Sequence, residues 1–222
     1  MSKNAKNANT NTAANASKGK ASKVDLSKPS KVDLSKPGDQ LPPPPASITL
    51  DWQAETATML AAAKEKPGSR GDQLGKVARF VASESPASMI LRAAASKPAP
   101  AINGAQAFIE LSRNVLSKLE KLAGRVADGQ PYCDANVLKE SKTGDASVPV
   151  ALAALGAGDE RQKAIVAAAS ARYPQGGNAQ MPAALGALEF LGIVKRKETG
   201  SVRNAEYVIV DQERANKLIP QA

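Results

Sequence analysis

The first 46 residues limit the foldable part of this chain, because they supply almost no large apolar side chains for a core. After Met1, residues 1–20 contain only Ser, Lys, Asn, Ala, Thr and Gly. Burial of apolar surface is what offsets the entropy lost on folding, so such a segment is expected to be disordered. We therefore expect a disordered arm over 1–46, with order beginning near Ser47 and about 170 residues left to fold.

The same arm contains a tandem octapeptide followed by a run of prolines. The sequence Ser-Lys-Val-Asp-Leu-Ser-Lys-Pro occurs at 22–29 and again at 30–37, and Pro42–Pro45 follow. Two copies are too few to build a solenoid, and the prolines favour an extended linker. The repeat is either a doubled docking motif or, more simply, a neutral duplication within that linker.

Positive charge is concentrated in the arm. Lys and Arg outnumber Asp and Glu by 30 to 21 in the whole chain, and by 8 to 3 within residues 1–50. A basic segment of this kind attracts polyanions by releasing their counterions, and nucleic acid is the commonest such partner of a soluble protein. A solubilising tail has the same composition, so both interpretations of the arm stay open.

The absence of His and the single cysteine, Cys133, exclude several kinds of chemistry. The chain can form neither an intramolecular disulfide nor a zinc site of the usual Cys/His type. It also lacks the His of a nucleophile–His pair or a Ser-His-Asp triad, and no phosphate-binding loop or GxGxxG motif is present. We therefore expect a protein that is not an enzyme and that uses no metal and no cofactor.

The hydropathy pattern predicts a protein without membrane segments. No apolar stretch approaches the roughly 20 residues of a membrane span, and the N-terminus lacks the hydrophobic core of a signal peptide. We expect a cytoplasmic protein, associated with the nucleoid or, if the chain is viral, located in the host cytoplasm.

Residues 47–128 are expected to form an Ala-rich helical region. Capping residues and apolar spacing predict short helices over 51–64, 71–83 and 86–97. A long helix is predicted over 101–128, where apolar residues recur near the heptad spacing at Phe108, Val115, Leu119, Leu122 and Val126. This 108–126 seam forms either a homodimer contact or, more simply, the core-facing side of one helix. The Gly129 and Pro131 that follow predict a domain boundary there.

Residues 129–222 are expected to form a second, C-terminal domain. Short helices are predicted after Asp134, over 148–157 and from Asp159 to Tyr173, and a last helix over 178–192 with Asn178 as its cap. The segments 193–197 and 205–210 are then predicted to form two strands, joined by a basic turn. No clear strand is evident between the earlier helices. The predicted fold class is mostly α with a small β-hairpin.

The order helix, strand, basic turn, strand over 178–210 resembles the winged helix-turn-helix superfamily, and the likeness extends over roughly residues 145–210. The resemblance implies a last helix that enters the major groove of DNA and a wing that touches the backbone or the minor groove. It implies base contacts by Asn178 and Gln180 at the helix start. It also implies phosphate contacts by four cations of the hairpin, Lys195, Arg196, Lys197 and Arg203.

The expected function is non-enzymatic nucleic-acid binding, with DNA favoured over RNA, in transcriptional regulation or nucleoprotein organisation. Only seven residues are aromatic, which argues against an RNA-binding platform of stacked rings. Residues 178–194 contain no Lys or Arg, and the Ala/Gly face of the 178–192 helix suits contact with a protein. The alternative is therefore a structural or adaptor protein that docks this face on a large assembly such as a polymerase, a ribosome or a virus particle.

Overall fold

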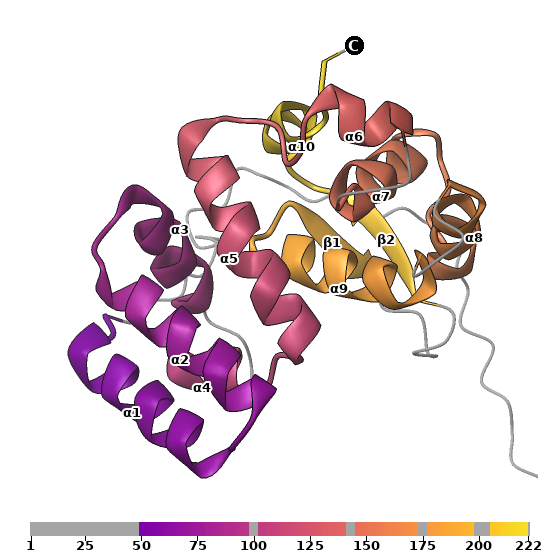
Figure 1. Ribbon diagram of the computed structural model, residues 1–222. Helices are drawn as coiled ribbons and strands as arrows, with labels where there is room; N and C mark the ends of the chain where they lie inside the picture. Colours follow the sequence, from indigo (N-terminus) through magenta and orange to yellow (C-terminus); the bar gives the residue numbers. More distant parts are fainter. Residues whose placement is uncertain (1–48, 98–101, 141–144, 173–176, 198–204, 222) are drawn as a thin grey trace, which may run out of the picture. The chain divides into compact units, whose positions relative to one another are not determined.

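The computed structural model describes residues 49–97, 102–140, 145–172, 177–197 and 205–221. The predicted arm, its tandem repeat and Arg203 lie outside these residues. The described part is mostly helical and includes one two-stranded antiparallel hairpin, as the sequence predicts (Figure 1).

The described residues form ten helices and two strands. In chain order they are α1 (Trp52–Glu65), α2 (Ser69–Ala82), α3 (Pro86–Ala95), α4 (Ala105–Ile109), α5 (Arg113–Asp128), α6 (Ala135–Glu140), α7 (Ser147–Gly156), α8 (Gln162–Arg172), α9 (Gly177–Phe190), β1 (Val194–Lys197), β2 (Glu206–Ile209) and α10 (Gln212–Leu218).

Helices α1 and α3 begin where the capping residues predict. The Asp51 side chain accepts hydrogen bonds from the backbone N–H groups of Gln53 and Ala54, at 3.0 and 3.3 Å. Ser85 caps α3 in the same way, and Pro86 occupies the first helical position, where a missing N–H costs nothing. These two predictions are confirmed, because capping chemistry is local to a few residues. Helix α2 begins at Ser69, two residues before its predicted start, and has no side-chain cap.

The single helix predicted over 101–128 is wrong. The chain forms α4 and α5 instead, and Ser112 adopts an extended conformation whose hydroxyl accepts a hydrogen bond from the Val115 N–H at 3.4 Å. A serine favours this capping role over a helix interior. The seam residues Phe108, Leu119 and Leu122 are fully buried in the chain's own core, which confirms the core-facing interpretation and leaves them inaccessible to a second copy.

Helix α5 joins the two regions that the sequence predicts as separate domains. It packs against α2 and α3 on one side of the predicted boundary at 129, and against α9 and α10 on the other (Figure 1). The described residues from Thr49 onward belong to one compact unit, and their buried apolar side chains form one continuous core. The end of α5 at Gly129, which adopts a left-handed conformation, therefore lies inside a single packed unit.

A partly buried carboxylate, that of Asp145, also links the two sides of this predicted boundary. Asp145 Oδ2 accepts hydrogen bonds from Lys118 Nζ of α5 and from Tyr132 Oη, both at 2.7 Å. Its Oδ1 accepts from the hydroxyl of Ser147 at 2.6 Å and from the backbone N–H of the same residue at 3.1 Å. Because Lys118 is only 5% exposed, this carboxylate provides its compensating charge and ties α5 to the start of α7.

The stability of the fold is expected to depend on pH through Asp145. Burial raises its pKa, but hydrogen bonds from Lys118 and Ser147 outweigh that effect and lower the pKa from 3.8 to about 2. A carboxyl whose pKa is lower in the folded state stabilises the fold above its unfolded pKa, and this contribution is lost as the pH falls through the folded value. Between pH 4 and pH 2 the wild type should lose about 1–2 kcal/mol more of its unfolding free energy than Asp145→Asn. Urea denaturation at stepped pH measures the difference, and equal losses in the two proteins would contradict the assignment.

Helix α10 is absent from the sequence-based prediction, although its N-terminal signal is present. The Asp211 side chain accepts a hydrogen bond from the Arg214 N–H at 3.0 Å, and Ala215 and Leu218 of the helix are buried. The helix is only seven residues long, which is too short for a clear 3.6-residue period. Its end is held to the segment before α6, because the Tyr132 N–H donates to the Leu218 carbonyl at 3.0 Å.

Candidate nucleic-acid interface

Strand β1 follows α9 through a tight turn that places the hairpin against the helix. Gly192 adopts a left-handed conformation with φ of +67°, and the Ile193 N–H donates to the Leu188 carbonyl at 2.9 Å. The two strands then pair antiparallel, with Lys195 opposite Val208 and Arg196 opposite Tyr207. Their predicted positions are confirmed to within a residue or two at each end.

A third chain segment pairs with the hairpin. Arg161, which lies between α7 and α8, forms an isolated antiparallel bridge with Glu206 of β2. The bridge has two backbone hydrogen bonds, from the Tyr207 N–H to the Glu160 carbonyl at 2.8 Å and from the Gln162 N–H to the Ala205 carbonyl at 2.9 Å. The start of α8 is thus attached to β2, which lies between Arg161 and β1. A strand of one residue leaves no recognisable pattern in a sequence. For this reason no strand is evident between the earlier helices from the sequence alone.

The predicted phosphate contacts fall into two groups. Lys195 and Arg196 are exposed, and neither makes an ion pair with any of the described residues. Lys197 is less exposed and is paired with Glu160. Arg203 lies outside the described residues, so its role stays a prediction.

Arg161 is a cation of the interface that the sequence pattern does not reveal. Its side chain is 76% exposed and its Nε lies 3.4 Å from Glu206 Oε1. The bridge places it in the same row as Lys197, since both residues lie opposite Glu206 in the pairing. The outer face of the hairpin therefore carries cations from two distant parts of the chain.

The surroundings of Arg196 are partly anionic. Arg196 lies opposite Tyr207, whose side chain is largely buried. Burial raises the pKa of Tyr207, and the nearby Glu189 carboxylate raises it further, whereas the Arg196 charge lowers it. Glu189 is thus close enough to oppose an approaching phosphate at this edge of the interface.

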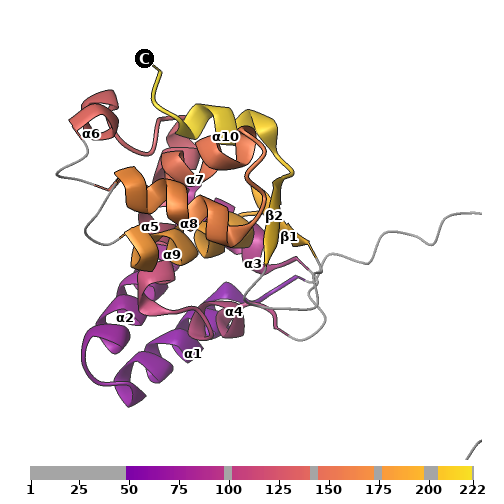
Figure 2. The same cartoon turned by 90° about the vertical axis from the view of Figure 1, so that its right-hand side faces the viewer.

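Helix α9 is enclosed by other helices, and this differs from what its predicted role requires. It packs against α5, α7 and α8 (Figures 1 and 2). Of its small residues, Ala184 and Ala187 are fully buried, and a Cβ added at Gly186 would lie 3.2 Å from a methyl group of Val115 in α5. The Ala/Gly face proposed for a protein partner is therefore covered largely by the chain's own helices, with Gly186 against α5.

The two predicted base contacts lie in the first turn of α9. The helix begins at Gly177, so Asn178 is its second residue and is not its cap. Gln180 is exposed.

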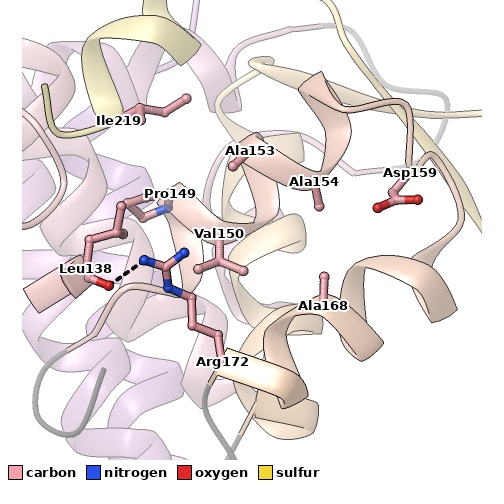
Figure 3. Close-up of a pocket in the computed structure, with 9 residues that line it drawn as sticks. All are labelled: Leu138, Pro149, Val150, Ala153, Ala154, Asp159, Ala168, Arg172 and Ile219. Carbon is pink, nitrogen blue, oxygen red and sulfur yellow. Dashed lines mark hydrogen bonds between the residues drawn. The ribbon is translucent and has the colours of Figure 1, made fainter. Parts of the chain in front are cut away.

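An apolar pocket lies away from the hairpin, among α6, α7, α8 and the residue after α10. It has a volume of about 180 Å³ and is lined by Leu138, Pro149, Val150, Ala153, Ala154, Asp159, Ala168, Arg172 and Ile219. Figure 3 shows its two charged residues well apart, with the Arg172 guanidinium donating to the Leu138 carbonyl. The charged side chains of the lining thus do not converge on a common point, as acid–base catalysis would require.

Comparison of the chain with protein-family models, with curated proteins and with solved structures gives no match in any of the three. Within the described ranges, no helix combines the length and the apolar character needed to cross a membrane. The same residues contain no group of three or more Cys, Asp or Glu side chains arranged to hold a metal ion.

Proposed function

We propose that this chain is a non-enzymatic protein that binds double-stranded DNA, with the segment from α7 to β2 acting as a winged helix. The order of α7, the one-residue strand at Arg161, α8, α9 and the hairpin matches the order of elements in that superfamily. The bridge between Arg161 and Glu206 supplies the strand that the order otherwise lacks. The observation that carries the proposal is a hairpin attached to α8, with two exposed cations on its first strand that pair with none of the described carboxylates.

Lys195 and Arg196 are the residues that contribute most to binding in this proposal. Neither has a carboxylate partner among the described residues, so a phosphate gains their charge without displacing an ion pair. Lys197 and Arg161 must share their charge with Glu160 and Glu206. Each phosphate neutralised releases condensed counterions, which favours binding at low salt.

The cellular role proposed on this basis is transcriptional regulation or nucleoprotein organisation in the cytoplasm or nucleoid. The basic arm over 1–46 would add to the attraction without requiring a fixed structure of its own, since counterion release depends on charge alone.

The apolar pocket favours a second candidate function, that of a structural or adaptor protein in a large assembly. Its lining consists mainly of Ala, Val, Leu, Ile and Pro side chains, which suit an apolar side chain of another protein (Figure 3). Failure of the chain to bind duplex DNA even at low salt would favour this candidate.

Removing both unpaired cations is expected to weaken DNA binding and to reduce its dependence on salt. The Lys195→Ala/Arg196→Ala variant should bind a labelled duplex about 10-fold more weakly near 50 mM salt, with the slope of log K against log salt smaller by about 2. Fluorescence anisotropy at stepped salt concentrations measures both quantities on the full chain.

The matched control removes the same net charge from another part of the molecule. Lys64→Ala/Lys76→Ala alters two exposed residues of α1 and α2, so it should change the slope by much less. Equal losses for the two double variants would show that net charge, and not the hairpin, attracts the duplex. The proposal fails if the wild-type chain binds no duplex at low salt.

A further inference from the structure

We infer that this chain binds duplex DNA through the phosphate backbone alone and does not read base edges. The inference rests on the proposed function and specifies how the same site recognises its ligand. It follows from one finding, that three helices pack against α9 and that the side chains it leaves exposed include no Lys or Arg.

The packing of α9 limits the surface that it can present to a major groove. The groove is about 12 Å wide and an α-helix with its side chains is about 10–12 Å across, so a helix that enters it must present one side free of other elements. Here α5, α7 and α8 all pack against α9 (Figure 2). From Met181 to Leu188 only Pro182 is exposed and Gly186 partly so.

The side chains that α9 does expose are poorly suited to base readout. Its exposed residues, among those whose side chains are described, are Ala179, Gln180, Pro182 and Glu189. Gln180 alone among these can make a bidentate contact, to adenine, whereas the Glu189 carboxylate is repelled by the adjacent phosphates. Arg and Lys, which most often read guanine, are absent from the helix.

The hairpin, in contrast, is suited to a repeating anionic backbone. Lys195 and Lys197 lie on the same face of β1, and at about 3.3 Å per residue their Cα atoms are about 6.6 Å apart. This separation corresponds to about two nucleotides of axial rise along one DNA strand. Arg161 adds a third cation, on the other side of Glu206 from Lys197. Because the Glu206 carboxylate is already paired, Lys195, Lys197 and Arg161 together present a net positive face.

The consequence is a protein whose affinity does not depend on the DNA sequence. Each readable base pair in a specific site typically contributes about 1–3 kcal/mol of discrimination, and an interface without base contacts forgoes it. Of the two cellular roles proposed above, nucleoprotein organisation is therefore the one that the geometry favours.

The test compares the affinity of the full chain for duplexes of equal length and different sequence at one salt concentration. AT-rich, GC-rich and mixed duplexes should bind with dissociation constants within about 3-fold of one another, because no contact with a base edge distinguishes their sequences. Asn178→Ala/Gln180→Ala should change each constant less than about 2-fold, whereas Lys195→Ala/Arg196→Ala should weaken all of them by the same factor. The thermal midpoint of each variant shows that it is folded.

Two results would overturn the inference, and they are distinguishable. Enrichment of a particular sequence from a random duplex library, abolished by Asn178→Ala/Gln180→Ala, would show that α9 reads bases and would leave the proposed function intact. The absence of binding to every duplex at low salt would remove the proposed function itself, and this inference with it.

Discussion

Replacing Asp145 with Ala is expected to lower the free energy of unfolding by about 3–5 kcal/mol. The substitution leaves the Lys118 ammonium group, which is 5% exposed, without a compensating charge. It also removes the acceptor of the hydroxyl groups of Tyr132 and Ser147, and an unsatisfied buried donor costs about 1–3 kcal/mol. Urea denaturation followed by circular dichroism at neutral pH measures the loss.

Two further variants identify the cause of that loss. Glu213→Ala breaks the exposed ion pair with Lys217, whose side chains are 80% and 53% exposed, and should change stability by less than about 1 kcal/mol. Lys118→Met/Asp145→Ala removes both charges of the pair and should recover part of the loss, because no unpaired buried ion remains. A loss below about 1 kcal/mol for Asp145→Ala alone would show that Lys118 does not depend on this carboxylate.

Replacing Gly71 with Ala is expected to destabilise the protein by about 2–4 kcal/mol. A Cβ at this position would lie 2.5 Å from the Ala63 carbonyl oxygen and closer still to that of Lys66. Both atoms belong to the backbone, that of Ala63 in the last turn of α1 and that of Lys66 just after it, so a rotamer change cannot relieve the contact. The two helices would have to separate, and differential scanning calorimetry should show a markedly lower melting temperature.

The same substitution at Gly124 is the matched control and should have the opposite sign. Gly124 lies inside α5, and a Cβ there would meet no atom within 4 Å. Ala is favoured over Gly in a helix interior by about 0.5–1 kcal/mol, so Gly124→Ala should stabilise the protein. If Gly71→Ala were also neutral or stabilising, the close approach of Gly71 to the carbonyl groups of Ala63 and Lys66 would be refuted.

Local chemistry made several elements predictable from the sequence. The caps at Asp51 and Ser85 involve hydrogen bonds within two or three residues, so sequence spacing suffices to locate them. The run of three basic residues at 195–197 likewise predicts charged side chains on β1, of which Lys195 and Arg196 are exposed. The break at Ser112 was harder, because the apolar seam on its two sides keeps a helical spacing although the chain bends there.

The tertiary partners of the candidate site were not predictable in the same way. Lys197 is paired with Glu160, 37 residues earlier, and the Arg161 bridge joins segments 45 residues apart. The small residues of α9 did indicate close packing with another helix. Which helices cover that face depends on the path of the whole chain, and in the structure α5, α7 and α8 pack against it.

The enclosure of α9 also determines where this protein can change its ligand preference by mutation. A substitution at Ala184 or Ala187 introduces a larger side chain into a filled core, so its first effect is on folding. Lys195 and Arg196 are exposed, and their replacement leaves the packing intact. New binding properties are therefore expected to arise by variation in the hairpin, while the sequence of α9 is restricted by the helices around it.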